Sequence, residues 1–174
     1  MSRITIEQLR SVLPMQAVYK WKLAGILMPG TSIEVPNAAD LDVRCVSTEL
    51  PKKTESPMEI SIRGHKIRQP GIYDYSHQIV MTFIESTNNF IHEFLNDWLT
   101  LCHDPETGAS VPKADLEATI LIHLLDVGDD PTWQYELIGC YPNDYELGTL
   151  DGQTADSMQP TITLNYDYFK MKKL

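Results

Sequence analysis

The sequence predicts an α+β domain that is mainly β, with a dominant antiparallel sheet and one amphipathic helix. Short segments with period-two alternation, rich in β-branched and aromatic residues, recur between clusters of Gly, Pro, Asn and Asp. One longer segment has helical periodicity instead. The order of strands, one packed helix and then strands favours α+β over a parallel α/β sheet.

Length and composition are those of one ordinary domain. The chain has 174 residues, which suits a single domain spanning 1–174 that buries about 70% of its extended-chain surface without disulfides. Its three cysteines, Cys45, Cys102 and Cys140, lie in or beside apolar patterns and are predicted to be reduced core residues. The sequence has neither a signal-peptide pattern nor a membrane-spanning apolar run, so we expect a soluble protein made in a cytoplasm.

The first third of the chain predicts a short helix and two strands. Thr5 and Gln8 form a capping box for a helix within an N-terminal extension, residues 1–14. A first strand is expected in 17–27 and a second in 41–48, where Pro51 follows and prevents a central ladder from continuing.

Residues 58–71 predict a hairpin around Gly64, within an extended hairpin that we place at 52–71. This stretch is basic although the chain has a net charge of −10, and such charge segregation favours head-to-tail self-association. An edge hairpin that is charged only to prevent aggregation is the alternative. The candidate inter-subunit and ring-stacking residues are Lys52, Lys53, Arg63, His65, Lys66 and Arg68.

A strand in 77–84 is followed by the polar cluster 85–89, which can cap a helix. The helix after it presents one apolar face, which we expect to be part of the core. That face comprises Phe90, Ile91, Phe94, Leu95, Trp98 and Leu99.

Between Lys113 and Lys170 the sequence has eleven Asp and Glu residues and no Lys or Arg. Strands are predicted here in 116–127, 132–141 and 161–169, and an acidic sheet surface excludes nucleic-acid recognition through a basic patch. In the last strand Ile162, Leu164, Tyr166 and Tyr168 are predicted to pack. The polar residues between them face either solvent or the lumen of a water-filled tube.

The residue clusters that suggest chemistry have simpler explanations. Cys102, His103 and Asp104 are adjacent at a helix end and point in different directions, and the acids 126, 129 and 130 suit a polar turn better than a calcium loop. His123 lies in an apolar strand, where a core or interface role is commoner than metal binding. We expect no enzyme activity, no catalytic residue, no metal and no cofactor.

Several segments together resemble the tail tube proteins of contractile-tailed bacteriophages, which are related in fold to the haemolysin-coregulated tube protein of type VI secretion. The resemblance spans most of the chain, and order and spacing carry it rather than one motif. The segments are Cys45 to Pro51, the hairpin around Gly64, Gln78 to Leu101 with its Trp98, Tyr135 to Asn143, and Thr161 to Phe169.

This resemblance implies two packed antiparallel sheets, as a sandwich or barrel flanked by the helix, and hexameric rings that stack into a tube. It implies a structural virion protein of the tail, assembled in the host cytoplasm, with a channel for DNA ejection and no membrane partner. Its implied partners are further copies of itself, the tail sheath protein, baseplate and tail-terminator proteins, the tape measure protein and genomic DNA in transit. Face alternation then makes Glu136, Thr161, Thr163, Asn165 and Asp167 candidate channel-facing residues.

Two alternatives stay open at this stage. The extension 1–14 and the loop 28–39 are longer than the minimal pattern, which also suits a baseplate tube initiator or the tube protein of a related contractile injection or secretion system. The more distant alternative is a soluble α+β binding domain, or an enzyme with a non-obvious site, that stays monomeric or forms a small closed oligomer at every concentration.

Overall fold

The computed structural model describes residues 6–7, 15–30, 33–148 and 150–174. The predicted helix of the extension 1–14, with its Thr5 cap, lies almost entirely outside these residues.

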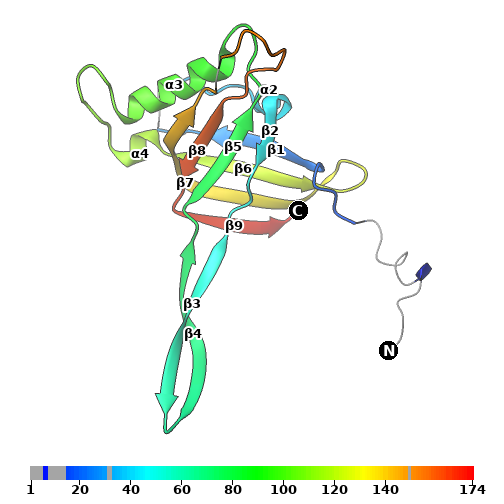
Figure 1. Ribbon diagram of the computed structural model, residues 1–174, viewed down its shortest axis with the longest axis vertical. Helices are drawn as coiled ribbons and strands as arrows, with labels where there is room; N and C mark the ends of the chain where they lie inside the picture. Colours follow the sequence, from blue (N-terminus) through cyan, green and yellow to red (C-terminus); the bar gives the residue numbers. More distant parts are fainter. Residues whose placement is uncertain (1–5, 8–14, 31–32, 149) are drawn as a thin grey trace.

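Seven strands form one antiparallel sheet in the order β1-β6-β7-β8-β5-β2, with β9 paired to β7 (Figure 1). A separate hairpin of two strands projects from this body (Figure 1). The sheet strands are β1 (Trp21–Leu27), β2 (Cys45–Thr48), β5 (Gln78–Phe83), β6 (Ala118–Leu125), β7 (Pro131–Glu146), β8 (Thr161–Asn165) and β9 (Tyr168–Lys173). The hairpin strands are β3 (Lys53–Ile62) and β4 (His65–Tyr75), and the helices are α2 (Ala38–Arg44), α3 (Phe90–Cys102) and α4 (Lys113–Leu116).

Strand β7 bends and thereby divides the sheet into two layers that cross one another (Figure 1). Its first part pairs with β6 and β9, and from Tyr141 onward it pairs with β8. At the bend Gly139 has a φ of +72°, and a Cβ there would collide with the carboxylate of Asp167. Only glycine fits both the backbone conformation and the space.

The core lies between the two layers. Leu23, Ile120 and Ile122 contribute from one layer, and Ile79 and Ile162 from the other, all in one buried cluster. The predicted class is confirmed: the protein is mainly β, with two antiparallel layers and few helices. Its described strands form an open sheet, not a closed barrel.

Helix α3 has the predicted boundaries and covers one end of this core. Ile91, Phe94, Leu95 and Trp98 are buried as expected, whereas Phe90 and Leu99 at the edges of that face are half-buried. The Trp98 indole N–H donates to the carbonyl of Leu116 at 2.9 Å. The N-terminal cap comes from Glu85, whose carboxylate accepts the backbone N–H groups of Ile91 and His92.

The strand predicted at 41–48 is wrong in its first half, because residues up to Arg44 belong to helix α2. The Asn37 side chain caps this helix by accepting the N–H of Ala39 at 3.1 Å. Leu41 is fully buried, and the Asp42 carboxylate accepts the N–H of Leu23 at 2.6 Å. The alternating pattern of residues 41–44 is short enough to suit either a helix or a strand, and the Asn37 cap before them favours the helix.

The single strand predicted at 161–169 is also wrong, because the chain changes layer after Tyr166 and forms β8 and β9. The N–H of Asp167 donates to the carbonyl of Ile138 at 3.0 Å, at the bend of β7. The alternation therefore shifts by one residue. Tyr168, predicted to pack, is 39% exposed, and Phe169 packs against the core instead.

Truncation of the buried α3 face should be costly. We expect Trp98→Ala or Phe94→Ala to lower the free energy of unfolding by about 3 to 5 kcal/mol, with half-buried Leu99→Ala as the milder control. Chemical denaturation measures this difference when unfolding is followed by far-UV circular dichroism, because this backbone signal does not rely on the fluorescence of Trp98. A loss below about 1 kcal/mol for the first two variants would mean that this face is not core.

The bend of β7 should tolerate no side chain. Gly139→Ala forces an alanine into a left-handed conformation, which costs roughly 1 to 2 kcal/mol, and it also displaces Asp167. We expect a loss of about 2 kcal/mol or more in the same denaturation assay. Gly152→Ala, where a Cβ would meet open space, is the matched control and should change stability little.

Candidate assembly interface

The hairpin β3–β4 extends away from the body, and almost every side chain on it is exposed (Figure 1). An isolated two-stranded hairpin is only marginally stable in water, because it has no second layer to cover an apolar face. A hairpin of this length is therefore suited to contact a partner.

The register gives the distal hairpin two different faces. Ile60 pairs with Ile67, and Ile62 pairs with His65. Since directly opposed residues share a face, Met58, Ile60, Ile62 and Ile67 make one side apolar. Three of these four side chains are more than half exposed. Sequence reasoning missed this apolar face, although the alternation at 58–62 was visible, because only the hairpin's charge was considered as a binding feature.

The predicted stacking residues are exposed, but they occupy different parts of the hairpin. Arg63, His65 and Lys66 lie at or beside the turn that ends the hairpin. Arg68 forms an ion pair with Glu59 at 2.8 Å. Lys52 and Lys53 lie at the root of the hairpin, where the Lys53 ammonium is 4.5 Å from the centre of the Tyr73 ring.

An aromatic cluster holds the root of the hairpin. The Tyr75 ring packs edge-on against Phe169 of β9, with ring centres 5.5 Å apart. His77, the residue before β5, has a φ of +55° and hydrogen bonds to the Tyr166 carbonyl and to Asp74. The backbone bond, and then the Asp74 bond, raise the pKa of His77. These contacts fix the direction in which the hairpin leaves the body.

The three polar residues predicted on β8 share one surface. Thr161, Thr163 and Asn165 alternate with buried Ile162 and Leu164, so they point away from the core. Neighbouring strands add further polar side chains on the same side. We call this surface the polar sheet face, and it comprises Gln78, Thr82, Asp144, Glu146, Thr161, Thr163 and Asn165.

The other two predicted channel residues lie elsewhere. Glu136 is on the outer side of the opposite layer, directly across from Lys170 of β9. Asp167 lies between β8 and β9 and forms an ion pair with Lys113 of α4. The structure therefore brings together three of the five residues.

Strand β9 carries a group of cations that sequence reasoning did not use. Lys170 and Lys172 are exposed and pair across the ladder with Glu136 and Gln134. The run of lysines at the C-terminal end of the sequence was the available signal.

The residues considered for chemistry have structural roles. The Asp104 carboxylate accepts the Thr107 hydroxyl at 2.6 Å, and this bond, followed by the Glu106 N–H, lowers the pKa of Asp104. Asp126 accepts two backbone N–H groups of its own turn, and His123 contacts Gln134 at 3.2 Å. Burial raises the pKa of the Cys102 thiol. No three His, Cys, Asp or Glu residues within the described ranges are placed to hold a metal ion.

No helix in the described part of the chain is long and apolar enough to cross a membrane.

No protein-family model and no curated protein matches the sequence. Solved structures do match. A chain of the anti-feeding prophage (AFP) baseplate has a TM-score of 0.66 at 14% identity, covering 90% of this chain and 94% of that one. A chain of the sheath–tube complex of PVC, an extracellular contractile injection system, has a TM-score of 0.64 at 14% identity and covers 99% of this chain and 100% of that one.

A chain of the PVC sheath/tube terminator has a TM-score of 0.66 at 16% identity, covering 92% and 99%. Each match extends over nearly the full length of both chains. The protein therefore shares the fold of tube, baseplate and terminator components of contractile injection systems, and the expected relationship in fold to tail tube proteins is confirmed.

Proposed function

We propose that this protein forms hexameric rings that stack into the inner tube of a contractile tail, and that the tube is a channel for DNA during ejection. The observation that carries the proposal is the projecting hairpin, whose apolar face is left uncovered by the residues that the structure describes. A second copy that covers this face would supply the missing layer. The shared fold supports the same assignment.

The polar sheet face is the proposed channel wall. Most of its side chains are hydroxyls, amides and the two carboxylates of Asp144 and Glu146. Val80 and Tyr141, opposite Thr163 and Asn165, are on the same side, and the described part of this side has no Lys or Arg. DNA phosphates would find no cation there to bind, so DNA could pass without being held. The outer side of the other layer carries Lys170 and Lys172 and is less suited to this role.

Two related roles use the same surfaces. The matching chains come from a baseplate, a sheath–tube complex and a terminator, with TM-scores of 0.64 to 0.66. A baseplate tube-initiator ring, or the tube of an injection system that carries protein, is therefore the second candidate. In each role we expect no catalytic activity, and sheath and baseplate components as partners.

The assembly state tests the proposal. Negative-stain electron microscopy of the untagged protein over a wide concentration range should show rings or hollow tubes of uniform diameter. Small featureless particles at every concentration would contradict it and favour a soluble α+β binding domain.

The apolar side of the hairpin should be needed for assembly and not for folding. Ile62 and Ile67 are 59% and 55% exposed, so Ile62→Ser combined with Ile67→Ser should leave the unfolding midpoint nearly unchanged. Sedimentation should nevertheless show fewer and smaller assemblies. Ser61→Asn, on the opposite face of the same strand, is the control. Full assembly of the double variant would remove the apolar face from the interface.

A further inference from the structure

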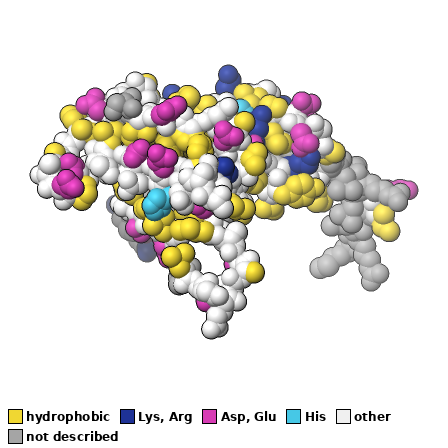
Figure 2. Space-filling model, turned by 90° about the horizontal axis from the view of Figure 1, so that it is seen from above, with side chains coloured by type: hydrophobic (Ala, Val, Ile, Leu, Met, Phe, Trp, Pro, Cys, Tyr) yellow, Lys and Arg dark blue, Asp and Glu magenta, His cyan; other side chains and the backbone are white. Residues whose placement is uncertain are grey.

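A hollow of about 450 Å³ lies between the segment before α2 and the first turns of α3. Its lining is mixed, with the apolar side chains of Val35 and Phe90 beside four carboxylates. The carboxylates belong to Glu34, Asp40, Glu93 and Asp97, and we call this site the acidic hollow. Figure 2 shows the upper face, where acidic, basic and hydrophobic side chains are interspersed.

The four carboxylates are not compensated within the described part of the chain. None of the ion pairs there includes them, and all four residues are exposed. Asp40 and Glu93 lie in the first turns of α2 and α3, where a negative charge is favourable. Glu34 and Asp97 do not lie in the first turn of a helix and so lack this stabilisation. Arg44 lies over the Phe90 ring beside the hollow, and it donates to the Ser86 hydroxyl at 2.6 Å instead of pairing with a carboxylate there.

The tip of the hairpin has the complementary composition. Arg63 and Lys66 are exposed, and neither belongs to an ion pair of the described residues, whereas Arg68 is already paired with Glu59. Ile62 and Ile67 adjoin these two cations along the chain, and Lys66, which pairs with Ser61, is on the opposite side of the hairpin from both isoleucines. The tip thus carries positive charge and apolar surface on its two sides, and a hollow that surrounds it with carboxylates and apolar side chains can contact both.

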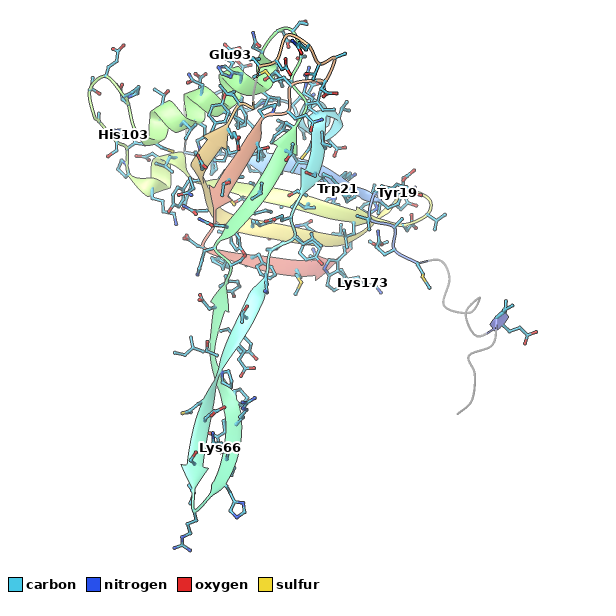
Figure 3. All side chains as sticks on the ribbon, viewed as in Figure 1. Tyr19, Trp21, Lys66, Glu93, His103 and Lys173 are labelled. Atoms are coloured by element: carbon cyan, nitrogen blue, oxygen red, sulfur yellow. The ribbon has the colours of Figure 1, made fainter. Side chains whose placement is uncertain are left out.

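The two surfaces lie at opposite ends of the molecule. Figure 3 shows Lys66 near the hairpin tip and Glu93 on α3, at the other end of the long axis. When all copies point the same way, a contact between opposite ends of identical copies is heterologous and repeats from one copy to the next along a stack.

We propose that the hairpin tip of one copy docks into the acidic hollow of another copy in the adjoining ring, with Arg63 and Lys66 facing the four carboxylates. This inference rests on the proposed tube function and identifies the surface that receives the hairpin. The occupant is a second copy because the charge and the apolar residues that match the hollow are on this same chain, at the end that a stack would bring to it.

Charge exchange between the two surfaces tests the docking. Lys66→Glu alone and Glu93→Lys alone should each weaken stacking, by about fivefold per contact at low salt, and raising the salt should lessen the difference. The double variant restores an opposite-charge pair and should recover most of the wild-type tube length in electron micrographs. Glu106→Lys, in the exposed loop after α3, is the matched control and should not shorten tubes.

A covalent test complements the exchange. Lys66→Cys combined with Asp97→Cys should give a ladder of disulfide-linked oligomers on oxidation, whereas either single variant should not extend beyond dimers. Lys66→Cys combined with Glu106→Cys, which lies outside the hollow, is the control pair and should give no such ladder.

The outcomes separate this inference from the tube function. If the wild-type protein forms tubes and neither single charge reversal shortens them, the acidic hollow is not the receptor and the tube function still stands. The same holds if the double variant fails to recover the wild-type tube length. A wild-type protein that never forms rings or tubes and gives no ladder would overturn both.

Discussion

The bend of β7 at Gly139 is the constraint on which the rest of the architecture depends. One strand belongs to both layers, so the change of direction must occur without breaking the ladder. Glycine permits the left-handed backbone there, and the Asp167 carboxylate occupies the space where a side chain would be. Asp167 is itself held by its N–H bond to Ile138 and by the ion pair with Lys113. Three segments far apart in the sequence are thereby joined at one corner.

This corner determines which surfaces the protein presents. Because the layers share a core, the outer side of one carries the polar sheet face while the outer side of the other carries Glu136 and the lysines of β9. The chain crosses from β8 to β9 at the same corner, and this crossing positions Phe169 against Tyr75 at the hairpin root. The direction of the hairpin is therefore tied to the core through a few aromatic contacts.

Most of the element types could be predicted from the sequence, because their patterns are local. The α3 face and the hairpin register follow from periodicity and from the turn around Gly64, and both agree with the structure. The errors arose where a long-range contact overrides a local pattern. Residues 41–44 became helical because Asn37 caps them and Leu41 is needed in the core, and 161–169 divided because Asp167 binds the bend of β7.

The candidate surfaces were harder to predict for a related reason. Alternation correctly grouped Thr161, Thr163 and Asn165, but it could not reveal that Glu136 lies on the opposite layer, since that depends on how the sheet folds over itself. The acidic hollow was not predictable either. Glu34, Asp40, Glu93 and Asp97 are brought together only when α2 and α3 are positioned by the core.

The distribution of charge adds an argument about polarity. Five of the fourteen lysines and arginines lie at residues 52–68, in and beside the hairpin, while the chain as a whole has a net charge of −10. Two such molecules repel at long range, and a face-to-face pair would bring like-charged ends together. Within a stack of rings, a head-to-tail arrangement places the cationic hairpin near the anionic end of a neighbour, whereas a head-to-head arrangement does not. The same asymmetry that opposes random association therefore selects one orientation, which is the requirement for a stack whose rings all point in the same direction.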